Sequence, residues 1–94
     1  MSRYKFAHFR EQGQDMIVVP LEPSFGNKSS DDQHAFIAAF QACTRSAQLP
    51  GTVVPIWRSG NRVNFIAPQP WHGFFRSAGI WNLILANINK ELTI

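Results

Sequence analysis

The sequence predicts an α+β domain built as a ββαββα pseudo-repeat, with a four-stranded antiparallel sheet and two helices on one of its faces. Three features recur in the same order in each half of the chain and favour this fold. The first is a pair of alternating or apolar runs around a Gly-centred turn, the second is a proline that ends the second run, and the third is a helical pattern. Because units as small as 1–48 and 51–94 can each cover only half of a core, we expect residues 1–94 to form a single domain.

The first unit begins with a predicted hairpin. Residues 4–10 and 16–21 form the two runs, and Gly13 between them tolerates the positive φ of a tight primed turn. We expect Gly13 and Gln14 to form a two-residue loop. Prolines then end the second strand, and a long polar loop leads to the first helix.

The first helix has clear start and stop signals. Ser30 and Gln33 have the spacing of a capping box, so the Ser30 hydroxyl is expected to accept the Gln33 N–H. The pair Pro50-Gly51 ends the helix. Its buried stripe is predicted to consist of Phe36, Phe40, Cys43 and Ala47, with His34, Gln41 and Arg45 away from it.

The second unit repeats this order. Residues 52–58 and 62–67 flank a turn at Gly60, and Pro55 lies inside the first of these strands. A proline donates no hydrogen bond to a neighbouring strand, so we expect this strand at an edge of the sheet. A longer helix follows Pro70, with an apolar arc that extends from Phe74 to Leu92.

The hairpin register decides which side chains share a face. A two-residue Gly60-Asn61 loop pairs Trp57 with Asn64, whereas a three-residue loop would place Arg58 opposite Arg62, which is unfavourable for like charges. The face under the helices would then hold Tyr4, Phe6, His8, Ile17, Val19, Leu21, Val54, Ile56, Val63, Phe65 and Ala67. The opposite, open face would hold Lys5, Ala7, Phe9, Met16, Val18, Pro55, Trp57, Arg62, Asn64 and Ile66.

The composition favours self-association. Charged residues make up 16% of the chain, below the roughly 25% usual for globular proteins, while hydrophobic residues make up 45%. The net charge of +3 is compatible with nucleic acid, but the basic residues are scattered and form no run. An apolar open face on such a weakly charged molecule predicts a partner that covers it.

No pattern of reactive residues indicates an enzyme, a metal centre or a cofactor. The side chains His8, His34, Cys43 and His72 lack the spacing that would hold two metal ligands on one element. Cys43 lies on the predicted apolar stripe, where burial suppresses thiol reactivity. The segment 26–30 ends like a phosphate-binding loop but lacks its first glycine, so an ordinary capped loop is the better interpretation.

The predicted compartment is the cytoplasm. A single cysteine excludes an intramolecular disulfide, and residues 1–5 lead into no apolar signal segment. The longest apolar segment, 80–88, is interrupted by asparagines and is shorter than the ~20 residues that cross a bilayer.

These observations predict a small non-enzymatic protein-interaction module, homodimeric through its apolar sheet face or its edge strand. The alternative is a single-stranded nucleic-acid-binding protein that stacks bases on an aromatic and cationic sheet face. A third hypothesis is a pocket or peptide-docking rim at the start of the second helix, formed by Trp71 and His72. The candidate binding residues of the sheet face are Lys5, Phe9, Trp57, Arg62 and Asn64.

Overall fold

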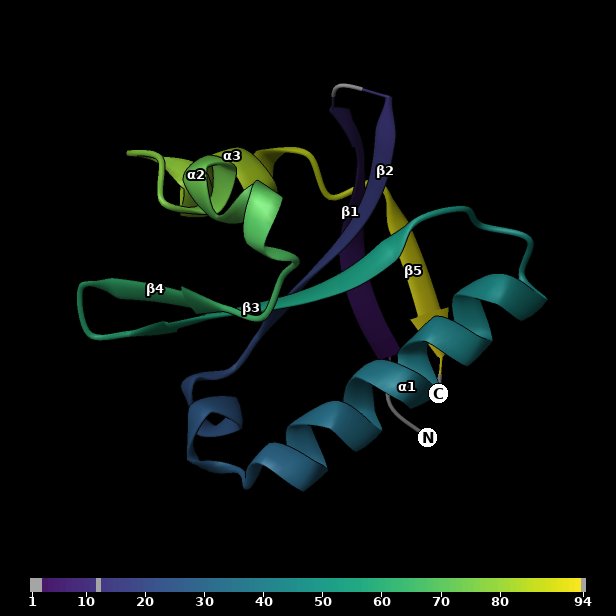
Figure 1. Cartoon of the computed structure of the whole chain (residues 1–94), viewed down its shortest axis with the longest axis horizontal. Helices are drawn as coiled ribbons and strands as arrows, with labels where there is room; N and C mark the ends of the chain where they lie inside the picture. Colours follow the sequence, from purple (N-terminus) through teal and green to yellow (C-terminus); the bar gives the residue numbers. More distant parts are fainter. Residues whose placement is uncertain (1–2, 12, 94) are drawn as a thin grey trace.

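The computed structural model describes residues 3–11 and 13–93 and has an α+β fold with a mixed sheet (Figure 1). Two hairpins, β1 with β2 and β3 with β4, account for most of the sheet. The elements in chain order are β1 (Arg3–Glu11), β2 (Gln14–Leu21), the 3-10 turn η1 (Pro23–Asn27), α1 (Ser30–Ser46), β3 (Thr52–Ser59), β4 (Arg62–Phe65), the 3-10 turn η2 (Gln69–Trp71), α2 (His72–Phe75), α3 (Ile80–Ala86) and β5 (Lys90–Thr93).

The sheet corrects the prediction of four antiparallel strands. It has five strands in the order β4-β3-β2-β1-β5, and β2 and β3 run parallel. The parallel pair follows from α1, because a helix that crosses over a sheet returns the chain in the same direction. The fifth strand, β5, uses residues that the apolar arc assigned to the end of the second helix, and it pairs with the first half of β1.

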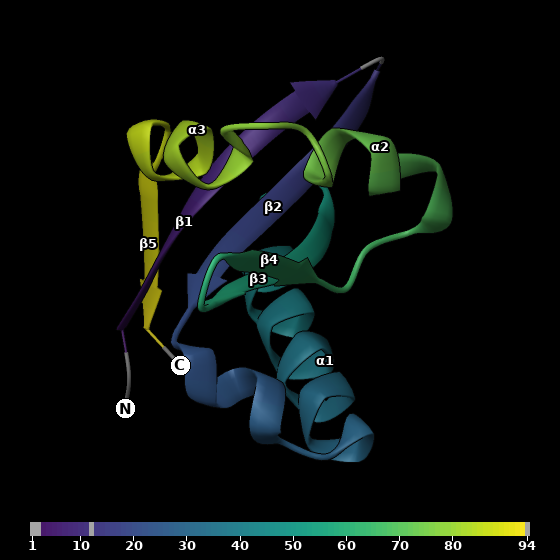
Figure 2. The same cartoon turned by 90° about the vertical axis from the view of Figure 1, so that its left-hand side faces the viewer.

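The helices also differ from prediction, because they cover both faces of the sheet (Figures 1 and 2). Helix α1 packs on one face through Phe36, Ile37 and Phe40, against a cluster that includes Phe6 and Ile17. Helices α2 and α3 cover the other face. The cluster beneath them contains Ala7, Met16, Val18, Val54, Ile56, Phe75, Ile80 and Ile84. The open apolar face of the prediction is therefore filled by the chain itself.

Within each hairpin, the side chains alternate between the two faces of the sheet as predicted. The second hairpin, however, is turned over relative to the first, so its two sets of side chains lie on the faces opposite to those predicted. Trp57 pairs with Asn64 as expected. In the first hairpin Glu11 pairs with Gln14, whereas a Gly13-Gln14 loop would have set Ala7 opposite Pro20 instead of Val18. The register therefore differs from the prediction by two residues, and a shift by an even number leaves each side chain on its predicted face. The parallel register then sets Val18 beside Val54, whereas the prediction placed these two side chains on opposite faces.

Pro55 lies in the interior of the sheet and not at its edge. It pairs with Val19 on one side, and on the other its carbonyl accepts the Ile66 N–H at 3.2 Å. Strand β4 ends at Phe65, so an N–H at position 55 would point beyond the end of β4. The missing N–H of Pro55 therefore removes no hydrogen bond from the regular part of the β3–β4 ladder. The two edge strands are β4 and β5.

Helix α1 begins one residue earlier than the capping box predicts. Ser29 is its N-cap, and the Ser29 hydroxyl accepts the Asp32 N–H at 3.1 Å. Phe40 is buried as predicted, but Cys43 is half-buried and Ala47 is exposed. The last buried position of the helix is a polar one, Thr44.

Gln41, predicted to lie away from the apolar stripe, joins α1 to the start of β3. Its side-chain amide donates to the Gly51 carbonyl at 2.9 Å and to the Thr44 hydroxyl at 3.1 Å. Its carbonyl oxygen accepts the Val53 N–H at 3.0 Å. One side chain thus satisfies two backbone groups at the point where the crossover enters the sheet.

Gln41→Leu is expected to lower the free energy of unfolding by about 1–3 kcal/mol, because it leaves part-buried backbone groups of Gly51 and Val53 without partners. Denaturant unfolding measures the change. The control is His34→Ala, at an exposed position of the same helix, which is expected to stay within about 0.5 kcal/mol of the parent. Equal effects of the two substitutions would contradict a structural role for Gln41.

The predicted second helix is divided into α2 and α3. The break contains Gly79 at φ 76°, a left-handed conformation that favours glycine. Phe75 is buried under α2, and Ile80 and Ile84 are buried under α3. Within residues 3–11 and 13–93 we find no helix with the length and apolar character needed to span a membrane.

Candidate functional site

The strands β1 and β2 separate before they end, and this fork is the most distinctive feature of the sheet. Their pairing extends from Glu11 and Gln14 to Ala7 and Val18. Beyond that point β1 pairs only with β5 and β2 only with β3. Figure 1 shows the two strands diverging toward the end of the molecule that carries the chain termini.

Pro20 gives the fork a physical cause. The Phe6 carbonyl accepts the Asn89 N–H at 3.2 Å, so the backbone groups of Phe6 point toward β5. Because these groups alternate in direction along a strand, those of the preceding residue, Lys5, point toward β2. Continuing the register of the hairpin would place Pro20 opposite Lys5. Because proline has no N–H, the Lys5 carbonyl would receive no hydrogen bond from it, and the ladder ends before this pair.

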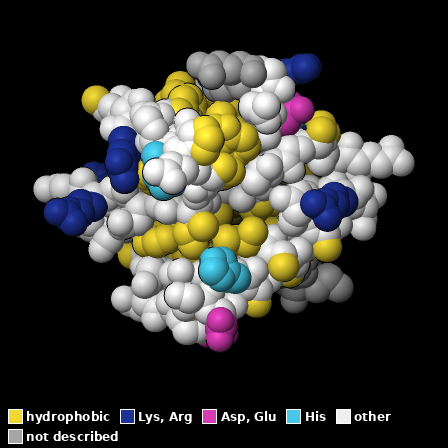
Figure 3. All heavy atoms as spheres, viewed as in Figure 1, with side chains coloured by type: hydrophobic (Ala, Val, Ile, Leu, Met, Phe, Trp, Pro, Cys, Tyr) yellow, Lys and Arg dark blue, Asp and Glu magenta, His cyan; other side chains and the backbone are white. Residues whose placement is uncertain are grey.

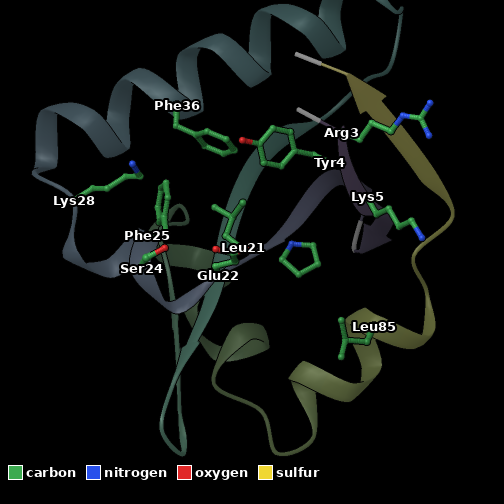
Figure 4. A pocket seen from close by; sticks show the side chains of 11 residues that line it. Arg3, Tyr4, Lys5, Leu21, Glu22, Ser24, Phe25, Lys28, Phe36 and Leu85 are labelled. Carbon is green, nitrogen blue, oxygen red and sulfur yellow. The ribbon is translucent and has the colours of Figure 1, made fainter. Parts of the chain in front are cut away.

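A cavity of about 630 Å³ lies in the fork. We call it the fork cleft. Figure 4 shows Tyr4, Phe36, Phe25 and Leu21 together on the side of α1, and Lys5 with Leu85 of α3 on the other side. The full lining is Arg3, Tyr4, Lys5, Pro20, Leu21, Glu22, Ser24, Phe25, Lys28, Phe36 and Leu85.

One wall of the fork cleft is a connected set of aromatic rings. Ring centroids lie 5.3 Å apart for Tyr4 and Phe36 and 5.4 Å apart for Phe36 and Phe25, both in edge-to-face geometry. The Gln33 side-chain amide donates to the Phe25 carbonyl at 3.0 Å and so ties η1 to α1. This wall is therefore held in place without a ligand.

The rim of the fork cleft is positively charged. Arg3, Lys5 and Lys28 line it with a single acidic residue, Glu22. Arg3 forms an exposed ion pair with Glu91, at 3.6 Å between Nε and Oε1, which contributes little because water screens it. The combination of a largely apolar wall and a cationic rim suits a ligand with an apolar centre and negative ends.

Gly26 allows η1 to lie against the sheet. A Cβ atom at this position would be 2.6 Å from Nε1 of Trp57, whose ring contacts Phe25 at a centroid distance of 5.1 Å. Trp57 is only 8% exposed and has little room to move. Any larger residue at position 26 therefore forces either η1 or the Trp57 ring to move, and η1 carries Phe25 of the cleft wall.

Gly26→Ala is expected to lower the free energy of unfolding by about 1–3 kcal/mol through this steric conflict. The matched control is Gly73→Ala in α2, where nothing lies within 4 Å of an added Cβ. That control is expected to be neutral or to stabilise by up to about 1 kcal/mol, because alanine favours helix. Thermal or denaturant unfolding of both variants gives the comparison, and a neutral Gly26→Ala would contradict the packing described.

The structure corrects the predicted grouping of binding residues on one open sheet face. Trp57 is buried on the side of α1, with Asn64 opposite it in the register, and Arg62 is exposed near the hairpin turn. Phe9 is half-buried on the other side of the sheet, in an edge-to-face contact with Phe74. Lys5 is the one residue of this set that lines the fork cleft.

Trp71 and His72 lie together at the start of α2, as predicted, but neither lines the fork cleft. Trp71 is half-buried against the core beneath α2 and α3. His72 Nε2 lies 2.9 Å from the Ala67 carbonyl, and its ring meets the ring of Phe65 edge to face. Trp71 therefore packs against this core, and His72 is held beside Ala67 and Phe65.

Sequence reasoning missed the aromatic wall of the fork cleft, namely Tyr4, Phe25 and Phe36. The signal available was Pro20 in a strand, which predicts a break in pairing once the neighbouring strand is known. Among the described residues, no three His, Cys, Asp or Glu side chains gather in a way that could hold a metal ion.

Comparisons with protein-family models, with curated proteins and with solved structures give no significant match.

Proposed function

We propose that this chain is a small non-enzymatic interaction module that binds an extended, acidic segment of a partner protein in the fork cleft. The observation that carries the proposal is the separation of β1 from β2 beside a largely apolar wall with a cationic rim. It supports binding by strand addition, in which a peptide pairs with a free strand edge and inserts alternate side chains into pockets.

The backbone supports this mode of binding. Arg3 and Lys5 direct their N–H and C=O groups toward the gap, because residues alternate in direction along a strand and Phe6 faces β5. An extended segment placed in the gap would pair with these groups and supply the donor that Pro20 cannot. Such a segment would complete the ladder that stops at Ala7 and Val18.

The lining determines which side chains the segment would carry. Side chains pointing toward α1 would meet Tyr4, Phe25 and Phe36, so an aromatic or branched aliphatic residue suits that position. Lys5 and Lys28 take part in neither of the ion pairs between described residues. Acidic residues on both sides of the apolar position would pair with them.

Fluorescence anisotropy with a labelled peptide of about seven residues, which spans about 23 Å when extended, tests the proposal. The probe has a Val-Phe-Val centre with Asp-Glu at each end, and its control has Lys in place of every acidic residue. We expect the acidic probe to bind at least about tenfold more tightly. Lys28→Glu is expected to weaken the acidic probe and strengthen the control, whereas Arg45→Glu, at an exposed position outside the cleft, changes neither.

Closing the fork provides a second test. Pro20→Val restores an N–H opposite Lys5, so β1 and β2 are expected to pair further and the acidic probe to lose affinity by about tenfold or more. Slow hydrogen exchange of the new amide at position 20 would report the closure. The proposal fails if neither probe binds, or if the acidic probe binds with unchanged affinity after the fork has closed.

Homodimerisation stays a prediction, but its location changes. The half of the predicted sheet face that comes from the first hairpin is covered by α2 and α3, and Trp57 of the second hairpin is buried on the side of α1, so the edge strands β4 and β5 are the remaining candidates. Sedimentation at micromolar concentration distinguishes the 10.6 kDa monomer from a particle of twice that mass.

Binding of single-stranded nucleic acid also stays a prediction, although Trp57, at 8% exposure, offers no free ring face on which a base could stack.

A further inference from the structure

A second cavity, of about 410 Å³, lies between the tip of the β3–β4 hairpin and the segment that joins α2 to α3. We call it the arginine pocket, because Arg58 and Arg76 are its charged residues. Its volume is within the range of small-molecule sites. The lining residues are Arg58, Asn61, Val63, Phe75, Arg76, Ser77, Ala78, Gly79, Ile80, Trp81 and Asn82.

The charge of this pocket is uncompensated. None of its described lining residues is acidic, and neither arginine takes part in the ion pairs between described residues, Arg3 with Glu91 and His8 with Asp15. Figure 3 shows Lys and Arg side chains at the left of the view, at the β3–β4 hairpin and between it and α2, with no acidic side chain beside them. Two positive charges that line one cavity favour an anionic ligand over a cationic one.

The chemistry of the pocket is that of a phosphate site next to an apolar one. The guanidinium group matches the geometry of phosphate oxygens and can bind them in pairs. The amides of Asn61 and Asn82 add neutral donors. The lining also contains the half-buried Val63 and Trp81, whose apolar surface suits the planar ring of a ligand, above the buried Phe75 and Ile80.

We propose that the arginine pocket binds a small molecule that joins a phosphate group to a planar ring, that is, a ligand of the mononucleotide class. The phosphate group would lie between Arg58 and Arg76, and the ring against the apolar residues. This site is independent of the fork cleft, because the two cavities share no lining residue. Failure of peptide binding would therefore leave this inference intact.

Titration of the isotope-labelled protein with adenosine 5′-monophosphate, followed by NMR, tests the inference. Chemical-shift changes are expected to concentrate in residues 58–63 and 75–82, the two segments that contain the lining residues. Adenosine, which lacks the phosphate group, and inorganic phosphate, which lacks the ring, are each expected to bind about tenfold more weakly or worse. Shifts spread over the whole surface, or equal affinity for adenosine, would overturn the proposal.

Charge-removing variants complete the test. Arg58→Gln and Arg76→Gln are each expected to weaken adenosine 5′-monophosphate binding by about tenfold, whereas Arg45→Gln, an exposed arginine on α1, leaves it unchanged. An equal loss in all three variants would indicate only general charge attraction and would overturn the site. So would a single-stranded oligonucleotide that binds far more tightly than the mononucleotide with a steep salt dependence, because that result would indicate a nucleic-acid surface.

Discussion

Phe40→Ala is expected to lower the free energy of unfolding by about 3–5 kcal/mol. The ring is 0% exposed and lies at the centre of the layer between α1 and the sheet. Its centroid is 5.6 Å from that of Phe6 and 5.8 Å from that of Tyr4, so alanine would leave a cavity bounded by two strand residues and a helix. A loss of this size is a large share of the ~5–15 kcal/mol that stabilises a typical domain.

Phe36→Ala, one turn earlier on α1, is the control. Phe36 is half-buried and lines the fork cleft, so its truncation is expected to cost less stability than that of Phe40 but to weaken the acidic peptide probe. Denaturant unfolding and anisotropy separate the two effects. Equal losses of stability in both variants would contradict the burial difference between these rings.

Trp57→Ala is expected to cost about 3–5 kcal/mol of unfolding free energy without altering the association state of the protein that remains folded. Trp57 is 8% exposed, and its ring contacts Phe25 edge to face and lies against Gly26. Its removal therefore opens a cavity between β3 and η1. The sequence alone, which placed Trp57 on an open sheet face, predicts the opposite result, dissociation of a dimer.

Trp81→Ala provides the comparison for Trp57, because Trp81 is half-buried at the surface of the other core cluster. Its truncation is expected to cost less stability. Sedimentation and denaturant unfolding of the two variants distinguish the alternatives. A Trp57→Ala protein of full stability that dissociates from dimer to monomer would restore the sequence-based interpretation and contradict the packing of η1 against β3.

The candidate sites were only partly accessible from the sequence. Lys5 was identified as a binding residue and lines the fork cleft, but it was grouped with Trp57, which lies on the other side of the sheet. Arg58 and Arg76 are separated by 17 intervening residues and share no motif, so only the fold of the hairpin against the α2–α3 segment brings them to one cavity.

The features that depend on residues close together in the chain follow from the sequence pattern. Alternating side chains and glycine turns specified two hairpins and the partition of each between two faces, and the pairing of Trp57 with Asn64 followed from the choice of turn. The amphipathic pattern and its stop signal specified α1 to within a few residues. These features depend on interactions between residues a few positions apart, and such interactions can be predicted from the order of residue types along the chain.

How the hairpins and helices combine depends on contacts between distant parts of the chain. The parallel register of β2 with β3 set the phase between the hairpins, and with it which side chains α1 and α3 cover. The tertiary structure also placed β5 on the edge of β1 that faces away from β2. The fork opens on the other edge of β1, where the register of the first hairpin would set Pro20 opposite Lys5. Pro20 is visible in the sequence, but its effect depends on which strand lies beside it, and that choice is made by burial over the whole chain.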